Sequence, residues 1–467
     1  MSSIHQLARW PHGPLSRREW LRLGGVALGG LSLSNLYFSR AAASVAAGGA
    51  AFGQAKSCIV LFLSGGPPQH ETWDPKPDAS ADIRGPFNPI ATSVPGLQVC
   101  ELMPRLAKQA HHWAVLRAVQ TKDNAHSSSG YYMLTGQPHQ PKNQENVTSQ
   151  APNLWPCMGA VVNRLRPQRG AFPVAITLPE HIWNTGMIPW PGQDAGFLGR
   201  PWDPWLVHCD PNEPGFQIAG LGSLPDVTPP RLQSRVSLAQ ALDRHASAVI
   251  HAAEFNRHDI WTEKAVDLLA SPQARRAFNL DEEPAHVRDR YGRHRFGQSV
   301  LVARRLIEAK VSLVQVNWTR DKDGSNDSPM WDTHQRNAEL LKTRLMPPMD
   351  AACSALIDDL AERGLLEETL VVWMGEFGRT PKINGGGGRD HWGDVFSVAL
   401  AGGGVQGGIV HGASDRQGAQ PADGLVRPED VMATVFHCLG MAADATITDT
   451  QGRPHPISRG EPIPQIL

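Results

Sequence analysis

Short runs of consecutive apolar residues alternate along the chain with longer amphipathic stretches. Continuous apolar runs closed by glycine or proline are typical of strands buried on both faces of a sheet, and apolar positions three or four residues apart predict helices. The runs that predict strands are 58–63, 114–119, 311–317, 369–377, 395–404 and 407–412. The stretches that predict helices are 103–113, 297–310, 345–364 and 429–440. This alternation predicts an α/β fold with a mainly parallel sheet, which binds ligands at the carboxyl ends of its strands.

The alternation weakens between residues 137 and 230, where the chain is rich in proline, glycine, asparagine and tryptophan. Long irregular segments inside an α/β domain are often functional additions. We therefore expect residues 137–230 to form an insertion or cap over the edge of the sheet. The domain that carries this cap is expected to span residues 56–467.

The first 55 residues have the composition of a targeting segment. Arg17 and Arg18 precede a weakly apolar, glycine-rich stretch, and small residues suited to cleavage follow it. This order resembles a twin-arginine export signal. It predicts transport by the twin-arginine translocase, a periplasmic or extracellular location and no stable membrane span after cleavage. A chance arginine pair before a structural helix is the alternative.

The charge balance and the composition narrow the choice of partners. The formal net charge is −1, and charged residues make up 19% of the 467 residues, so no basic stripe favours nucleic acid or an acidic membrane surface. The six cysteines are scattered without a C-x-x-C motif, and we expect them to be buried apolar side chains. Fourteen tryptophans against four tyrosines leave two uses open, which are ligand binding on loops and packing against the scaffold.

Polar clusters follow four of the predicted strands, where a sheet of this kind builds its site. Carboxylates and imidazoles together suit zinc or manganese best, and calcium or magnesium remain open. The clusters contain His70, Glu71 and Asp74; His126 with Ser127, Ser128 and Ser129; Asp332 and His334; and Glu376, Arg379, Asp390 and His391. Their joint placement predicts a site for a divalent metal or an anion.

Each cluster taken alone also has a structural explanation. Asp332 and His334 fit a helix cap and a surface histidine, and Asp390 fits an ion pair with Arg379 or Arg389. The serine run caps a helix in the simplest interpretation. A hydroxyl at a helix N-terminus is also suited to act as a nucleophile.

Several motifs together resemble one large family of exported bacterial proteins. They are the twin-arginine start, GGPPQHETWDPKPDA from residue 65, RGPFNPIATSVPGLQVCELMPRLA from 84, WDTH from 331, TLVVWMGEFGRTPKIN from 369 and GRDHW from 388. The chain resembles the domain of unknown function 1501, in the alkaline-phosphatase and sulfatase-like superfamily. This resemblance covers essentially the whole chain. It implies an alkaline-phosphatase-like three-layer α/β/α fold with a metal site at the carboxyl ends of the strands.

The resemblance implies which residues hold the metal. WDTH is similar to the superfamily's Asp and His pair, GRDHW supplies a late histidine with an acid beside it, and GEFG keeps an acid but lacks the usual ligand histidine. The first strand ends in Ser64 in place of the expected aspartate, for which His70, Glu71 or Asp74 of the following loop could substitute. These departures favour one metal, held by Asp332, His334 and His391, over a full two-metal site. The implied metal candidates are Asp332, His334, His391, Glu376, Asp390, His70 and Asp74.

A second set of residues is implied to act on the substrate. NAHSSSGYYMLTG is similar to the nucleophile segment of sulfatases, but the Cys, Pro and Arg of that motif are missing, which argues against a formylglycine sulfatase. His126 falls on the nucleophile position. A serine of the run that includes Ser127 and Ser128, or a water near His126, is expected to attack. Arg379 is expected to hold the anion in a bidentate grip.

The leading hypothesis is an exported metal-dependent hydrolase of phosphate or sulfate esters, acting on a small-molecule or glycan ester. Phe377, Ser64 and the missing nucleophile signature favour the alternative, a catalytically inactive member of the fold that binds a glycan or a protein through its Trp-rich cap. Against this alternative, polar groups at so many strand ends cost stability if they serve nothing. A mutase or transferase on the same fold also stays open.

Overall fold

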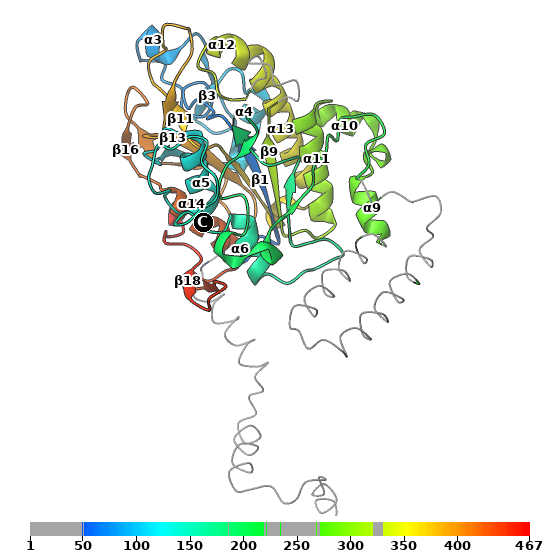
Figure 1. The fold of residues 1–467 in the computed structure, drawn as a ribbon. Coiled ribbons are helices and arrows are strands. Elements are labelled where there is room, and N and C mark those ends of the chain that lie inside the picture. The colour runs from blue at the N-terminus through cyan, green and yellow to red at the C-terminus, as the bar shows by residue number, and fades with distance from the viewer. Residues whose placement is uncertain are drawn as a thin grey trace, which may run out of the picture. The chain divides into compact units, whose positions relative to one another are not determined.

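An eight-stranded sheet forms the centre of the described structure (Figure 1). Its strands, in spatial order, are β14 (Val410–His411), β4 (Trp113–Val119), β13 (Phe396–Ala401), β10 (Thr369–Met374), β1 (Ser57–Leu63), β9 (Leu313–Trp318), β5 (Ala175–Leu178) and β8 (Trp205–Leu206). β1 is parallel to both of its neighbours, β9 and β10. Among these eight strands only β13 runs antiparallel to its neighbours, so the expected mainly parallel sheet is confirmed.

The computed structural model describes residues 49, 51–184, 186–218, 221, 234, 268, 271–320 and 330–467. The expected export signal in residues 1–55 lies almost entirely outside these residues. No helix in the described ranges is both long enough and apolar enough to cross a bilayer.

Both faces of the sheet are buried, as the continuous apolar runs predict. All seven residues of β1 are buried, and alternate residues belong to different hydrophobic clusters because successive side chains of a strand point to opposite faces. Ile59, Leu61 and Leu63 pack on one face, and Val60 and Phe62 pack on the other. A strand that is buried on both faces therefore lies between two layers of helices.

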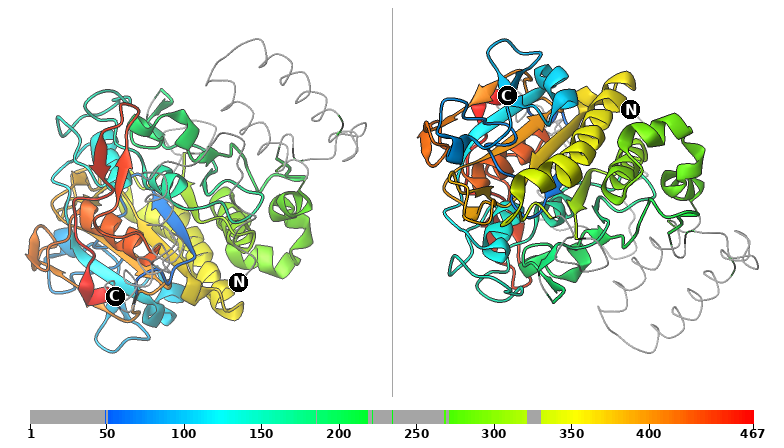
Figure 2. Two further views of the ribbon diagram at one scale, coloured as in Figure 1. Left: turned by 90° about the horizontal axis from the view of Figure 1, so that it is seen from below. Right: turned by 90° about the horizontal axis from the view of Figure 1, so that it is seen from above.

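Helices cover the two faces and complete a three-layer α/β/α arrangement (Figures 1 and 2). The helices on the face of Ile59 are α4 (Pro104–Lys108), α9 (Pro272–Phe278), α10 (Ala285–Tyr291), α11 (Arg295–Glu308) and α13 (Met346–Glu362). The helices on the face of Val60 are α5 (His126–Thr135), α6 (Met158–Leu165) and α14 (Pro428–Cys438). The predicted helices correspond to α4, α11, α13 and α14.

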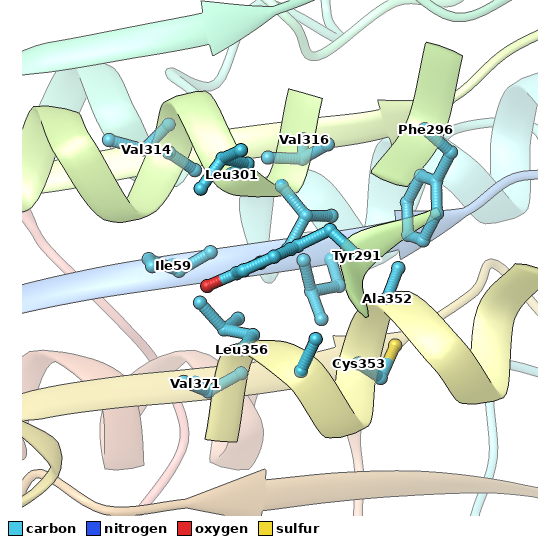
Figure 3. Close-up of a cluster of buried hydrophobic side chains, with 14 of the residues drawn as sticks. Ile59, Tyr291, Phe296, Leu301, Val314, Val316, Ala352, Cys353, Leu356 and Val371 are labelled. Carbon is cyan, nitrogen blue, oxygen red and sulfur yellow. The ribbon is translucent and has the colours of Figure 1, made fainter. Parts of the chain in front are cut away.

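Figure 3 shows how the first face is filled. Tyr291 of α10, Leu301 of α11 and Leu356 of α13 meet Ile59 of β1 in a cluster from which water is excluded. The hydroxyl of Tyr291 donates a hydrogen bond to Oδ2 of Asp359 at 2.9 Å, so the one polar atom of this ring is satisfied. This packing fixes β1, β9 and β10, whose carboxyl ends carry most of the predicted site.

The segment 137–230 contributes to the central layers as well as to loops. It supplies helix α6 and strands β5 and β8, and β5 pairs in parallel with β9. β5 has four residues and β8 has two, and prolines and tryptophans surround both strands. Their apolar runs are therefore too short to predict a strand. Part of the expected insertion thus forms one edge of the sheet.

The loops contain several two-stranded sheets and short helices. The two-stranded sheets pair β2 (Pro89–Ala91) with β3 (Gln98–Cys100), β6 (Trp183–Asn184) with β7 (Ile188–Pro189), β11 (Gly378–Arg379) with β12 (His391–Trp392), β15 (Ala413–Ser414) with β16 (Pro421–Asp423), and β17 (Thr446–Thr448) with β18 (Pro454–Pro456). Two further short α-helices in the described part of the chain are α3 (Ala81–Arg84) and α12 (Asn337–Leu340). The pairing of β11 with β12 sets Arg379 opposite His391.

Candidate functional site

The candidate site lies on the loops that follow β4, β9 and β10, at the carboxyl edge of the parallel strands. His126 begins α5 after β4, Asp332 follows β9, and Glu376 comes two residues after β10 ends. His391 lies in β12, directly before the antiparallel strand β13, which starts at this same edge. The topology therefore brings together residues that are far apart in sequence.

His126, Asp332 and His391 form a group that could hold a metal ion. One ligand atom from each residue lies within 4.8 Å of those of the other two. Nε2 of His391 is 3.1 Å from Oδ1 of Asp332, and Nε2 of His126 is 3.3 Å from Oδ2 of the same carboxylate. Donor atoms at about 2.1 Å from a tetrahedral ion are roughly 3.4 Å from one another, so these separations fit a common metal.

His334 borders this group. Its Nε2 lies 3.0 Å from Oδ1 of Asp332 and 2.9 Å from Nε2 of His391. Two ring nitrogens at this distance need a proton or a cation between them. His334 is 41% exposed, against 7% for His126, so it forms the side of the group that is open to water.

The three imidazoles share one hydrogen-bonding pattern, with an acceptor next to each Nδ1. Nδ1 of His126 is 2.7 Å from Oε1 of Glu376, Nδ1 of His334 is 2.7 Å from Oδ1 of Asp390, and Nδ1 of His391 is 2.7 Å from the carbonyl oxygen of Asn124. In each case the atom beside Nδ1 is a carboxylate or carbonyl oxygen, which accepts a hydrogen bond. A neutral ring in such a place carries its proton on Nδ1 and turns the lone pair of Nε2 toward Asp332. This is the outer-shell arrangement typical of metal-binding histidines.

The charges of the group are strongly coupled. Burial raises the pKa of Asp332, but Arg379 and then His126 outweigh burial and hold that pKa far below its usual value. Burial lowers the pKa of His126, whereas Asp332 and Glu376 raise it to about 9. Burial, helped by His126 and Arg379, lowers the pKa of His391 to about 4. The hydrogen bond to Asp332 also raises the pKa of His334. At neutral pH and without a metal, His126 therefore carries an extra proton and His391 does not.

Arg379 is fully buried and does not offer the expected grip on an anion. Its guanidinium donates to Oδ1 of Asp332 at 2.6 Å, to the carbonyls of Gly66 and Arg389 at 3.1 and 3.0 Å, and to the carbonyl of Gly65. These contacts fix the position of the Asp332 carboxylate. The interpretation of Arg379 as an anion clamp therefore has to be corrected, because its donors face the protein.

Two glycines allow the backbone to approach the group. Gly65 has φ of +112°, and a Cβ there would lie 2.5 Å from the backbone nitrogen of Asp332. Its N–H donates to Oε1 of Glu376 at 2.8 Å, which helps to hold the carboxylate that faces His126. A Cβ on Gly388 would lie 2.0 Å from the backbone carbonyl of His334. Gly388, the last glycine of the run and the first residue of GRDHW, thus lets that loop pack directly on His334.

The serines that were expected to attack a substrate have structural partners. The hydroxyl of Ser127 accepts a hydrogen bond from Nδ2 of Asn184 at 3.0 Å. The hydroxyl of Ser128 donates to Oδ1 of Asp123 at 2.7 Å and accepts from the backbone of Gln144 at 2.9 Å. Both serines are buried. Their contacts anchor the start of α5, which carries His126.

His70 and Asp74 lie away from the group in their contacts. Nε2 of His70 meets the carbonyl of Gln417 at 2.8 Å, and the Asp74 carboxylate binds Lys76 and Ser414. Among the described residues, neither belongs to the set whose ligand atoms converge. The expected metal candidates therefore fall into three groups. Asp332 and His391 converge, with His334 beside them. Glu376 and Asp390 contact the imidazoles from outside, and His70 and Asp74 are remote.

Sequence reasoning missed two features of the site. His126 was expected at the position of the nucleophile, but its side chain faces Asp332, as a ligand would. A histidine that begins a helix just after a strand could have indicated this role. Asn124 acts through a backbone carbonyl, for which the sequence carries no signal.

Distant likeness to solved structures was found. The sulfatase PsFucS1 from Pseudoalteromonas sp. aligns at TM-score 0.40 and 12% identity, over 87% of this chain and 72% of that one. The lipoteichoic acid synthase LtaP from Listeria monocytogenes aligns at 0.37 and 10% over 86% and 78%. A protein of the alkaline phosphatase superfamily from Vibrio parahaemolyticus aligns at 0.34 and 11% over 84% and 67%. Likeness at this level says nothing about activity.

The sequence comparisons are more specific. No curated protein matches this chain. One family model, described as a protein of unknown function (DUF1501), matches residues 55–467, which include the whole chain after the expected signal. The chain therefore belongs to the DUF1501 family.

Proposed function

We propose that this protein is an exported metal-dependent hydrolase of phosphate or sulfate esters, with a divalent ion held by His126, Asp332 and His391. The observation that carries the proposal is the orientation of the imidazoles: each Nδ1 meets an acceptor, so the Nε2 atoms and the Asp332 carboxylate converge as electron-rich donors. A divalent cation would replace the proton of His126 between these donors. His334 is placed to act as a fourth ligand.

The donor set indicates which ion fits. Three imidazole nitrogens and one carboxylate are the ligands that zinc prefers in proteins, and manganese is the second choice. Calcium and magnesium prefer oxygen ligands and larger coordination numbers or bound waters. A zinc or manganese ion here would act as a Lewis acid and would lower the pKa of a bound water, which makes that water a better nucleophile.

The residues of the chain support attack by water over attack by serine. The hydroxyls of Ser127 and Ser128 are occupied by Asn184 and Asp123. Arg379 orients Asp332, and Glu376 orients His126. The His334 side chain is 41% exposed, so water can reach the group from this side. The choice of a phosphate or sulfate ester rests on the motif resemblance, as does the expectation of a small-molecule or glycan substrate.

Export is supported by the sequence of the first 55 residues. The pair Arg17 and Arg18 with the segments that follow resembles a twin-arginine signal. In this proposal the twin-arginine translocase moves the folded chain to the periplasm or the exterior, and the hydrolase works there.

The test is the metal content of the protein, purified without chelator, beside the Asp332→Ala and His391→Ala variants. Near-stoichiometric zinc or manganese is expected in the wild type and much less in both variants. His208→Ala is the matched control, because His208 is exposed and lies outside the group. Turnover of phosphate and sulfate esters is then measured on the loaded protein.

Two results would contradict the proposal. Absence of bound metal, with all variants folded, would remove the metal site and favour a catalytically inactive binding protein of the same fold. Bound metal with no turnover of either ester class would leave a metal protein without the proposed activity.

A further inference from the structure

A second feature of the molecule is a groove at the opposite end of the sheet. It has a volume of about 760 Å³ and is lined by α6, by the segment that leads into β5 and by the edge strand β8. Val174 directly precedes β5, and Arg166 donates to the carbonyl of Lys56, directly before β1. The groove therefore lies at the amino ends of the strands. With seven residues in β1, it is on the order of 20 Å from the candidate metal group.

Three arginines line this groove. Among the described residues, no carboxylate forms an ion pair with Arg164, Arg166 or Arg200, and Asp203 is the one acid of the described lining. Burial raises the pKa of Asp203, and the charge of Arg200 opposes this shift. The Asp203 carboxylate instead accepts from the backbone of Ala195 at 2.7 Å. The lining thus carries an excess of positive charge in a chain whose net charge is −1.

Two half-buried tryptophans supply flat apolar surface beside these cations. The guanidinium of Arg164 lies 4.8 Å from the ring centre of Trp202. Trp205 is backed by Phe172, whose ring is stacked at 6.4 Å, and by the edge of Phe278 at 6.0 Å. Rings held in this way lose little freedom when a ligand binds. The groove combines rigid aromatic faces with planar donors that suit sulfate or carboxylate.

We propose that this groove binds an acidic oligosaccharide, with sugar rings on Trp202 and Trp205 and sulfate or carboxylate groups on Arg164, Arg166 and Arg200. Sugar rings have the flat apolar faces that tryptophan covers, and their charged substituents lie at the rim of the ring, where the arginines can reach. Burial, reinforced by Arg169, lowers the pKa of Arg166 to about 10. A nucleic acid fits less well, because the chain has no basic stripe to follow a phosphate backbone.

The test measures binding of three tetrasaccharides to the full chain by titration calorimetry and tryptophan fluorescence. The probes are a galacturonic acid tetramer, a sulfated tetrasaccharide and neutral maltotetraose. Binding of at least one acidic probe is expected, with no binding of the neutral one. The Arg164→Gln/Arg200→Gln variant is expected to raise Kd roughly tenfold or more, since each charged hydrogen bond is worth about that factor. Trp202→Ala is expected to lose the fluorescence change.

The matched control is Arg459→Gln. Arg459 also lies over a tryptophan, 5.2 Å from the ring centre of Trp155, but neither residue lines the groove. Its affinity for the acidic probe is expected to equal that of the wild type. Asp332→Ala, which tests the metal group, is also expected to leave this affinity unchanged, so the two proposals can fail separately.

Three outcomes would overturn the groove proposal. One is absence of binding of both acidic probes to the folded wild-type chain. Another is equal affinity in the wild type and the double arginine variant. The third is tighter binding of a single-stranded oligonucleotide with the same dependence on Arg164 and Arg200, which would assign the groove to nucleic acid.

Discussion

Oε1 of Glu376 lies 2.7 Å from Nδ1 of His126 and 2.8 Å from the backbone nitrogen of Gly65, in a place that water does not reach. One buried carboxylate oxygen thus joins the first strand's end to the helix that carries His126. This contact sets the direction of the His126 ring, so the metal affinity depends on a residue that need not touch the metal.

Replacing Glu376 is therefore expected to weaken metal binding. Glu376→Ala removes the acceptor of His126 and leaves the N–H of Gly65 unpaired, which predicts a ten- to hundredfold loss of affinity, roughly the range for outer-shell changes. Glu376→Gln keeps the acceptor oxygen and is expected to lose less. Competition with a chromophoric chelator measures both affinities. Equal affinities in Glu376→Ala and the wild type would show that Glu376 does not orient His126.

Metal binding is expected to release a proton from His126. Without metal, Asp332 and Glu376 raise the pKa of His126 to about 9 against the opposing effect of burial, so the ring is charged at pH 7 and has to lose a proton before its Nε2 can bind a cation. The apparent affinity should rise with pH up to about 9 and level off above it. Titration calorimetry in buffers of different ionisation enthalpy counts the protons. A count near zero at pH 7 would contradict this assignment.

A methyl group at Gly388 is expected to disturb the site without unfolding the protein. In Gly388→Ala the new Cβ would meet the backbone carbonyl of His334 at 2.0 Å, so the loop has to move away from His334. We expect weaker metal binding and a free energy of unfolding that falls by about 1–3 kcal/mol. Gly385→Ala is the control, because a Cβ there has no neighbour within 4 Å. Similar metal affinities in the two variants would exclude a contribution of this contact.

Acid is expected to destabilise the helical layer through Asp359. Burial raises the pKa of this carboxyl, but Arg363 and then Arg304 outweigh burial and lower it. A pKa below the unfolded value of about 3.9 adds stability that is present above that pH and is lost as the pH falls through the folded value. The free energy of unfolding of the wild type, measured with urea, should therefore fall below about pH 4.

Asp359→Asn separates this effect from general acid unfolding. It leaves the nearly fully buried Arg304 without one of its carboxylates and is expected to cost about 3–5 kcal/mol at pH 7, with a shallower loss on acidification. Glu362→Gln is the control, because Glu362 binds Arg290 but is 59% exposed. A wild-type slope in Asp359→Asn would show that other carboxyls control acid stability.

The sequence predicted those parts of the fold that depend on local pattern. β1 and β10 are buried at every position and apolar at every position after the first, because both faces are covered, and such runs are visible without a structure. β5 and β8 were not expected as sheet strands, because four and two residues give no clear period. Their place in the sheet depends on pairing with β9, which is a tertiary property.

The candidate site shows the same division. Asp332 and His391 were predicted because each follows or precedes a recognisable strand, and Asn124 was not, because a backbone carbonyl has no identity in the sequence. The burial of Arg379 was also hidden, since a Gly-Arg-Thr turn is usually exposed. Arg379 is buried because its guanidinium donates to the carbonyls of Gly65 and Gly66, which are distant in sequence.

Because β13 runs antiparallel to β10, residues 375–395 leave the sheet and return to it at the same edge. A loop that closes between adjacent strands loses little chain entropy, and the loss grows only slowly with its length. Glu376 and His391 are thus brought near each other by a local closure, whereas His126 and Asp332 arrive through contacts between distant parts of the chain. Local contacts form early in folding. Glu376 and His391 are therefore expected to reach their positions first during folding, and His126 and Asp332 are expected to pack against them later.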